Sequence, residues 1–174
     1  GADVTLISGK VNIAPVPFVK LVDVISAKDM YDEVVKAAEY SDIIIKAAAV
    51  ADYRPAVVSD NKIKKKDGDM SIELTRTEDI IGTIGKNKKK EQFLCGFSME
   101  TENMLENSKA KLDKKNLDMI VANNVKVKGA GFGTDTNVVT IITRNDCREL
   151  PIMSKEEVAD EILSYIMQLK EEKH

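Results

Sequence analysis

Asp52, Tyr53 and Arg54, three side chains that could bind a ligand, directly follow five small residues at positions 47–51. The small residues follow an apolar run at 43–45, which predicts a strand buried on both faces. Ligands of open α/β sheets bind beyond the carboxyl ends of such strands, and small residues there let a flat ligand reach the main chain. Tight packing of the alanines under a helix is the alternative, and this segment alone favours neither.

Lysine is dense in three stretches, 62–66, 86–90 and 109–115. Such clusters suit a small anionic ligand, although each taken singly is more typical of a solvated face. The formal net charge is −3, which argues against general nucleic-acid binding. We expect ammonium groups from separate stretches to converge on one cleft beside the alanines.

Composition narrows the possible chemistry. The chain of 174 residues is 43% hydrophobic and 32% charged, which is typical of a soluble globular protein. Its single histidine, His174, is the last residue, so no histidine-based nucleophile or histidine-rich metal site is predicted. Cys95 and Cys147 lack metal-ligand spacing, and Cys95 is predicted to be inert core. Chemistry must then rest on lysines, carboxylates, amides and backbone N–H groups.

Location follows from what the chain does not contain. No apolar run approaches the ~20 residues that a membrane-spanning helix needs. No basic and apolar leader marks the chain for secretion. We therefore expect a cytoplasmic protein with no membrane partner.

Strand and helix patterns alternate along the chain, which predicts an α/β, Rossmann-like fold with a mainly parallel sheet and helices on both faces. Ser26, Thr77 and Ser154 are placed to cap helices. The chain has no linker, so a single domain over residues 1–174 is predicted. Strands are expected at 4–7, 19–25, 42–46, 92–97, 118–122 and 138–143, and helices at 26–39, 101–115 and after Ser154.

A β-hairpin flap is predicted from residues 62–66 and 70–76, which an Asp-Gly turn signal joins. Alternation along its first strand would place Lys62, Lys64 and Lys66 on one face. A charged strand edge that prevents pairing with other chains is the alternative for these lysines.

Six motifs occur in this order along the chain: KAAAVADYRP, NKIKK, EDII, GFSMET, KKNLDMIVANN and GFGTDTN. Together they resemble the motifs of phosphopantothenoylcysteine synthetase, also called phosphopantothenate–cysteine ligase. In many bacteria this enzyme is the C-terminal half of a bifunctional coenzyme A biosynthesis protein. The resemblance implies a ligase that joins 4′-phosphopantothenate to L-cysteine through an acyl-cytidylate made from CTP, with Mg²⁺, and it implies a homodimer.

The resemblance also implies a nucleotide site. Lys62 would be catalytic and contact the nucleotide, and Asp52 would bind base, ribose or metal. Phe97 would stack on or wall the base, although an aromatic residue at such a position is more often core, and the Gly-Phe match favours the base contact. The other implied nucleotide contacts are Lys46, Ala47, Ala48, Glu78, Asp79, Ile80, Ile81, Lys111 and Lys115.

Some expected parts are not in this sequence. It opens on what resembles the second strand of a doubly wound unit, without the first strand, the glycine-rich loop and the first helix of the family. The chain alone is therefore expected to bind CTP weakly and to turn over poorly. The alternatives are the same ligase with ATP, and a non-catalytic nucleotide-binding or dimerisation module.

Overall fold

The computed structural model describes residues 1–14, 16–64, 69–100, 104–124 and 134–172. Contacts divide the chain into two compact units. Unit 1 comprises residues 1–37 and 49–80, and unit 2 comprises residues 38–48 and 81–174. The single domain over residues 1–174 stays a prediction.

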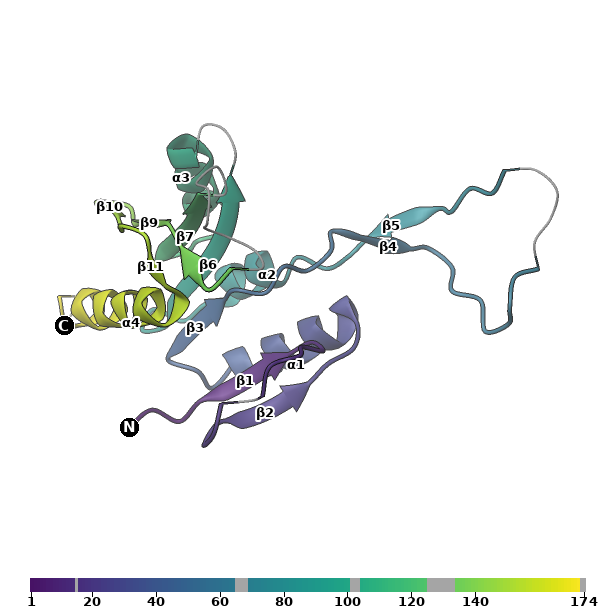
Figure 1. Ribbon diagram of the computed structural model, residues 1–174, viewed down its shortest axis with the longest axis horizontal. Helices are drawn as coiled ribbons and strands as arrows, with labels where there is room; N and C mark the ends of the chain where they lie inside the picture. Colours follow the sequence, from purple (N-terminus) through teal and green to yellow (C-terminus); the bar gives the residue numbers. More distant parts are fainter. Residues whose placement is uncertain (15, 65–68, 101–103, 125–133, 173–174) are drawn as a thin grey trace. The chain divides into compact units, whose positions relative to one another are not determined.

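Unit 2 is built on a five-stranded sheet in the order β10-β9-β7-β6-β3 (Figure 1). β3, β6 and β7 pair in parallel, whereas β9 lies antiparallel between β7 and β10. The predicted α/β class with a mainly parallel sheet is confirmed. The strands are β3 (Ile43–Lys46), β6 (Phe93–Glu100), β7 (Met119–Asn124), β9 (Val139–Ile142) and β10 (Cys147–Glu149).

Helices cover both faces of this sheet, as predicted. On one face, α4 (Lys155–Glu171) buries a stripe at helical spacing in the main hydrophobic cluster. On the other face lie α2 (Ile80–Asn87) and α3 (Met104–Lys114). A side chain at Gly96 would bring its Cβ to 2.6 Å from Ile81 Cδ1, so the glycine lets α2 approach β6. The α4 stripe is Val158, Ile162, Tyr165 and Ile166.

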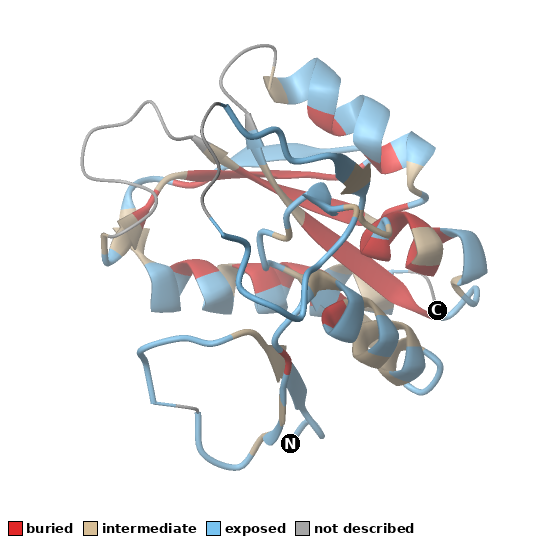
Figure 2. Cartoon of the chain, turned by 90° about the vertical axis from the view of Figure 1, so that its right-hand side faces the viewer, coloured by how far each residue is buried: buried red, intermediate tan, exposed pale blue. Residues whose placement is uncertain are grey.

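Buried residues are concentrated in this sheet and on its helices (Figure 2). Leu94 and Cys95 in β6 and Val121 in β7 are 0% exposed. Cys95 is thus core, as predicted, and burial raises the pKa of its thiol to about 12. In the part of the chain that the structure describes, no helix is long and apolar enough to cross a membrane.

Two of the predicted helix caps are present. Ser154 Oγ accepts from the Glu157 N–H at 3.2 Å, and Glu157 Oε2 accepts from the Ser154 N–H at 2.8 Å. Ser26 and Asp29 form the same reciprocal pair before α1 (Ala27–Ala38). The Ser26 N–H lowers the pKa of Asp29, because the hydrogen bond favours its ionised form.

Unit 1 holds two small sheets. β1 (Thr5–Ser8) pairs in parallel with β2 (Lys20–Asp23), which α1 follows. β4 (Tyr53–Pro55) pairs antiparallel with β5 (Leu74–Arg76) and forms the hairpin flap.

The first strand of this hairpin is not the predicted one. β4 comes from Tyr53–Pro55, whereas residues 62–64 form no strand and Lys66 lies outside the described residues. The prediction that strand alternation places these lysines on one face is therefore wrong for Lys62 and Lys64, which the structure describes. Tyr53 pairs with Arg76, whose guanidinium lies 5.8 Å from the ring centroid, and aromatic residues favour strands more than lysine does.

Thr77 does not cap α2, so the helix cap predicted at Thr77 is wrong. α2 begins at Ile80, so the N-cap position falls on Asp79. The Thr77 hydroxyl instead donates to the Ala51 carbonyl at 2.6 Å, and its N–H donates to the Asp52 carbonyl at 3.0 Å. Thr77 thus closes the base of the hairpin.

A further strand pair completes unit 2 near the start of α4. β8 (Thr136–Asn137) pairs antiparallel with β11 (Met153–Ser154). The predicted strand at 138–143 is present as β9. Only Val138 separates Asn137 from the start of β9. Gly131, Phe132 and Gly133 of the GFGTDTN motif lie outside the described residues.

Candidate functional site at the carboxyl ends of the parallel strands

The end of β3 carries the first predicted site residues. Lys46 pairs with Gly96 of β6 and is half-buried, and Ala47 and Ala48 follow it directly. Both alanines are exposed, so the alternative in which they pack tightly under a helix is wrong for them. The main chain here is open to a ligand at the edge where α/β proteins bind one.

Phe97 lies on the next strand of the same edge. Side chains alternate along β6, and Phe93 and Cys95 belong to the cluster that α4 covers. Phe97 is half-buried and packs against that cluster. One side of its ring therefore contributes to the core, and its exposed part remains available to a ligand.

Asn123 and Asn137 are functional candidates that the sequence reasoning missed. Asn123 lies at the carboxyl end of β7, where it pairs with Met99 of β6 and Val139 of β9. Asn137 Nδ2 donates to Asn123 Oδ1 at 2.6 Å, and Asn137 is only 8% exposed. An asparagine that ends an apolar strand at 119–122 was the signal that could have identified this position.

Lys111 and Lys115 belong to α3 and its end. The Lys115 N–H donates to the Lys111 carbonyl at 3.0 Å, so the two residues lie one turn apart as predicted. Ser98 Oγ of β6 lies 3.4 Å from Ser108 Oγ of α3, which places α3 over the face opposite to Phe97. The structure therefore does not bring these lysines to the face that carries the Phe97 ring.

Asn116 ends α3 as a C-terminal cap. It has a positive φ of 50°, and its N–H and that of Leu117 donate to the carbonyls of Asp113 and Leu112. This is the bond pattern of a Schellman motif. Asn116 Nδ2 also donates to the Gly85 carbonyl at 2.9 Å, which joins α3 to α2.

Gly85 permits this close contact between the two helices. A side chain there would bring its Cβ to 1.8 Å from the Lys115 carbonyl oxygen. A second link lies nearby, because Lys88 Nζ donates to Asp118 Oδ2 at 2.5 Å and both side chains are at most 8% exposed. The same Asp118 oxygen accepts from the Leu94 N–H at 2.8 Å. The backbone that carries Lys115 is thus held firmly.

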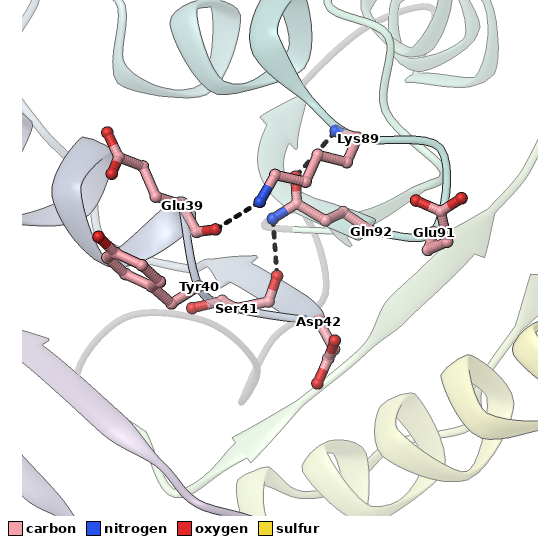
Figure 3. Close-up of a pocket in the computed structure, with 7 residues that line it drawn as sticks. All are labelled: Glu39, Tyr40, Ser41, Asp42, Lys89, Glu91 and Gln92. Atoms are coloured by element: carbon pink, nitrogen blue, oxygen red, sulfur yellow. Dashed lines mark hydrogen bonds between the residues drawn. The ribbon is translucent and has the colours of Figure 1, made fainter.

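A cavity of about 370 Å³ lies at the amino ends of β3 and β6, away from this edge (Figure 3). Gln92 Nε2 donates to the carbonyls of Ala38 and Ser41, and its Oε1 accepts from the Lys89 N–H. Gln92 therefore has a structural role, because its bonds join the end of α1 and the residues before β3 to the loop before β6. The lining residues are Glu39, Tyr40, Ser41, Asp42, Lys89, Glu91 and Gln92.

The remaining predicted site residues lie mostly in unit 1. Asp52 and Lys62 are exposed, and neither has a role in the described core. Ile80 and Ile81, at the start of α2, are 3% and 9% exposed, so only their main chain could serve a ligand. Asp79 is exposed, whereas Glu78 is half-buried. Convergence of these residues with those of unit 2 stays a prediction.

A family model described as the C-terminal domain of DNA/pantothenate metabolism flavoprotein (DFP) matches residues 1–169. The chain belongs to this family. It is 51% identical over 174 residues to the coenzyme A biosynthesis bifunctional protein CoaBC of Bacillus subtilis (strain 168), covering 99% of this chain and 43% of that protein. The resemblance stated from the motifs is thereby confirmed for this DFP domain.

Two further comparisons place the DFP domain among known proteins. A cysteine/cysteine sulfinic acid decarboxylase from an unknown prokaryotic organism is 46% identical over 171 residues, with 97% of this chain and 48% of that protein covered. The crystal structure of a CoaBC C-terminal domain has a TM-score of 0.82 and 44% identity, with 99% of this chain and 78% of that chain covered. The chain thus spans less than half the length of either curated relative.

Proposed function

We propose that this DFP domain is the ligase that joins 4′-phosphopantothenate to L-cysteine at the expense of CTP. The observation that carries the proposal is the open main chain at Ala47 and Ala48, beyond the end of β3 and beside Phe97. The 51% identity to a bifunctional coenzyme A biosynthesis protein supports the assignment.

The reaction would proceed in two steps, activation of the carboxylate and then amide formation. A carboxylate oxygen of 4′-phosphopantothenate attacks the α-phosphorus of CTP, and pyrophosphate leaves. The cysteine amino group then attacks the acyl carbon, loses a proton, and expels CMP. Both steps build negative charge on oxygen, which fixed cations and N–H donors stabilise.

Lys62 would supply the cation that acts in catalysis. Its ammonium is exposed on a segment outside any strand, so it can follow a phosphate as charge moves. Lys46 would add positive charge around the nucleotide, and Lys111 and Lys115 would add it from the α3 face of the sheet, opposite to the Phe97 ring. Glu78, Asp79, Ile80 and Ile81 would contribute main-chain contacts, because two acids there repel phosphate and two isoleucines are buried.

Mg²⁺ would be held mainly by the substrate. Among the described residues no group of three or more His, Cys, Asp or Glu side chains could hold a metal ion. Mg²⁺ is commonly bound by one or two carboxylates together with substrate phosphates, and the exposed Asp52 fits that need. When bound, the ion would neutralise charge on the triphosphate.

A cytoplasmic homodimer is part of the proposal. The segment between β4 and β5 exposes large apolar side chains, including Val57 at 82% and Val58 at 77%. Exposed apolar patches of this kind commonly mark protein contacts. A second copy of the chain would cover them.

One relative is named as a decarboxylase, but the residues favour ligation for this chain. The only histidine of this sequence is His174, so residues 1–173 contain no histidine that could act as the acid or base of a decarboxylation. The alternatives are the same ligase with ATP in place of CTP, and a non-catalytic nucleotide-binding or dimerisation module.

The test supplies the natural full-length protein with 4′-phosphopantothenate, L-cysteine, Mg²⁺ and either CTP or ATP. The expected result is release of CMP and pyrophosphate in equal amounts, each dependent on 4′-phosphopantothenate. AMP release with ATP at the higher rate would overturn the CTP assignment. No nucleotide cleavage with either triphosphate would overturn the ligase.

A further inference from the structure

Asn123 lies near the carboxyl end of β7, the third parallel strand of the candidate site, on the same side of the sheet as Phe97. Met119 and Val121 belong to the cluster under α4, so alternation along β7 places Asn123 on that face. Phe97 pairs with Val121, and Met99 pairs with Asn123. The Asn123 carboxamide therefore lies one step further toward the carboxyl edge than the Phe97 ring, on the neighbouring strand.

Two hydrogen bonds fix which end of this carboxamide faces outward. The Val138 N–H donates to Asn137 Oδ1 at 3.0 Å, and a backbone N–H can only donate. Asn137 must then turn its Nδ2 the other way, where it donates to Asn123 Oδ1 at 2.6 Å. Asn123 in turn must present its Nδ2 away from Asn137.

The outward end of Asn123 is therefore a pair of N–H donors. No residue in the described part of the chain accepts a hydrogen bond from Asn123 Nδ2. Asn123 is half-buried, in contrast to Asn137 at 8% exposure behind it. Donors at this edge suit a ligand rich in acceptor oxygens, such as a phosphate, a ribose hydroxyl or a carboxylate.

We propose that Asn137 is a positioning residue that turns the Asn123 carboxamide so that its Nδ2 donors face an acceptor oxygen of a substrate. The inference rests on the proposed function. The nucleotide and 4′-phosphopantothenate both carry such oxygens, and the experiment distinguishes the two sources. The Val138 N–H thus determines, through Asn137, that Asn123 offers hydrogen-bond donors to the ligand and not its carbonyl oxygen.

Two substitutions in the natural full-length protein test this inference. Asn137→Asp keeps the shape and still accepts from the Val138 N–H, but it cannot donate to Asn123. Asn123 would then turn its Nδ2 inward and present Oδ1 to the ligand. Asn137→Ala is the uncharged companion, in which the Asn123 carboxamide is released without being reversed. Asn145→Asp, at an exposed turn, is the control for the added charge.

The readouts are the dissociation constants of CTP and of 4′-phosphopantothenate by calorimetry, and the thermal midpoint. Asn137→Asp is expected to weaken one of the two ligands about tenfold, the scale of one hydrogen bond to a charged group, and Asn137→Ala less. Asn123→Ala should weaken the same ligand. The double variant Asn123→Ala/Asn137→Asp should bind no more weakly than Asn123→Ala alone.

A purely structural role for Asn137 predicts something else. In that case the thermal midpoint falls while both dissociation constants stay within twofold of wild type, or the effects of the two substitutions add. Either result would overturn the inference and leave the proposed function intact. Wild-type protein that binds neither ligand would overturn the proposed function, and the inference with it.

Discussion

The two units of this chain use their residues differently. In unit 2 the central strands β6, β7 and β9 carry the buried residues of the sheet, with Leu94, Cys95 and Ile141 all at 0% exposure. In unit 1 no residue of β1, β2, β4 or β5 is buried, and Asp52 and Lys62 are exposed. Substitutions should therefore separate by unit: packing controls unit 2, and ligand contacts control the exposed residues of unit 1.

The largest expected effect on stability is in unit 2, at the Lys88–Asp118 pair. Asp118→Ala leaves the Lys88 ammonium and the Leu94 N–H buried without this partner, which should cost about 3–5 kcal/mol of unfolding free energy. Urea unfolding measures it. Asp113→Ala is the control, because Asp113 and Arg144 are 76% and 49% exposed and such pairs contribute about 0–1 kcal/mol. Equal losses in both variants would contradict the contrast between buried and exposed charge.

Two glycines, one in each unit, give the next largest difference. Gly85→Ala would force its Cβ against the Lys115 carbonyl oxygen, and overpacking of this kind costs about 1–3 kcal/mol. Gly9→Ala, in unit 1, meets nothing within 4 Å and should change stability little. Thermal unfolding of the two variants side by side measures the difference. If Gly85→Ala unfolds at the wild-type temperature, the described contact between α2 and α3 is wrong.

The end of α3 offers a smaller effect that separates two roles of one residue. Asn116→Gly keeps the positive φ but loses the bond to the Gly85 carbonyl, whereas Asn116→Ala loses both. Asn116→Ala should therefore be the less stable variant, by about 1 kcal/mol. Chemical denaturation of both variants measures this. A more stable Asn116→Ala would mean that the positive φ is not needed.

Thiol reactivity tests packing within unit 2 without any substitution. The pKa of Cys95, raised to about 12 by burial, keeps its thiol protonated at pH 8, whereas Cys147 is exposed. An aromatic disulfide reagent should titrate one thiol in the native protein and two in denaturant. Two thiols that react rapidly under native conditions would show that the sheet is not closed around Cys95.

Sequence reasoning was strongest where one local pattern decides the structure. The stripe of α4 and its Ser154–Glu157 box were predictable, because helical spacing and capping are local. The hairpin was misassigned, because an Asp-Gly turn signal suggested a strand at 62–66, whereas the pairing of Tyr53 with Arg76 set the ladder. The pairing of two segments that lie far apart in the sequence cannot be predicted from the local pattern of either segment alone.

The candidate site was predictable only in part. The exposed alanines after β3 lie at the expected sheet edge. The Asn123–Asn137 bond was not predictable, because it joins residues 14 positions apart through the register of β7 and β9. The separation of Lys111 and Lys115 from the Phe97 face depends on which side of the sheet α3 covers, which spacing alone does not give.

The most direct test of the account compares Lys62→Gln with Lys64→Gln in the natural full-length protein, with CMP release and thermal midpoint as readouts. Both lysines are exposed in unit 1, so neither substitution should move the midpoint. Lys62→Gln should lower turnover roughly 100-fold, the scale for one group that stabilises a transition state, and Lys64→Gln should leave turnover near wild type. Equal turnover in the two variants, or a midpoint that falls only with Lys62→Gln, would contradict the assignment of ligase chemistry to an exposed lysine.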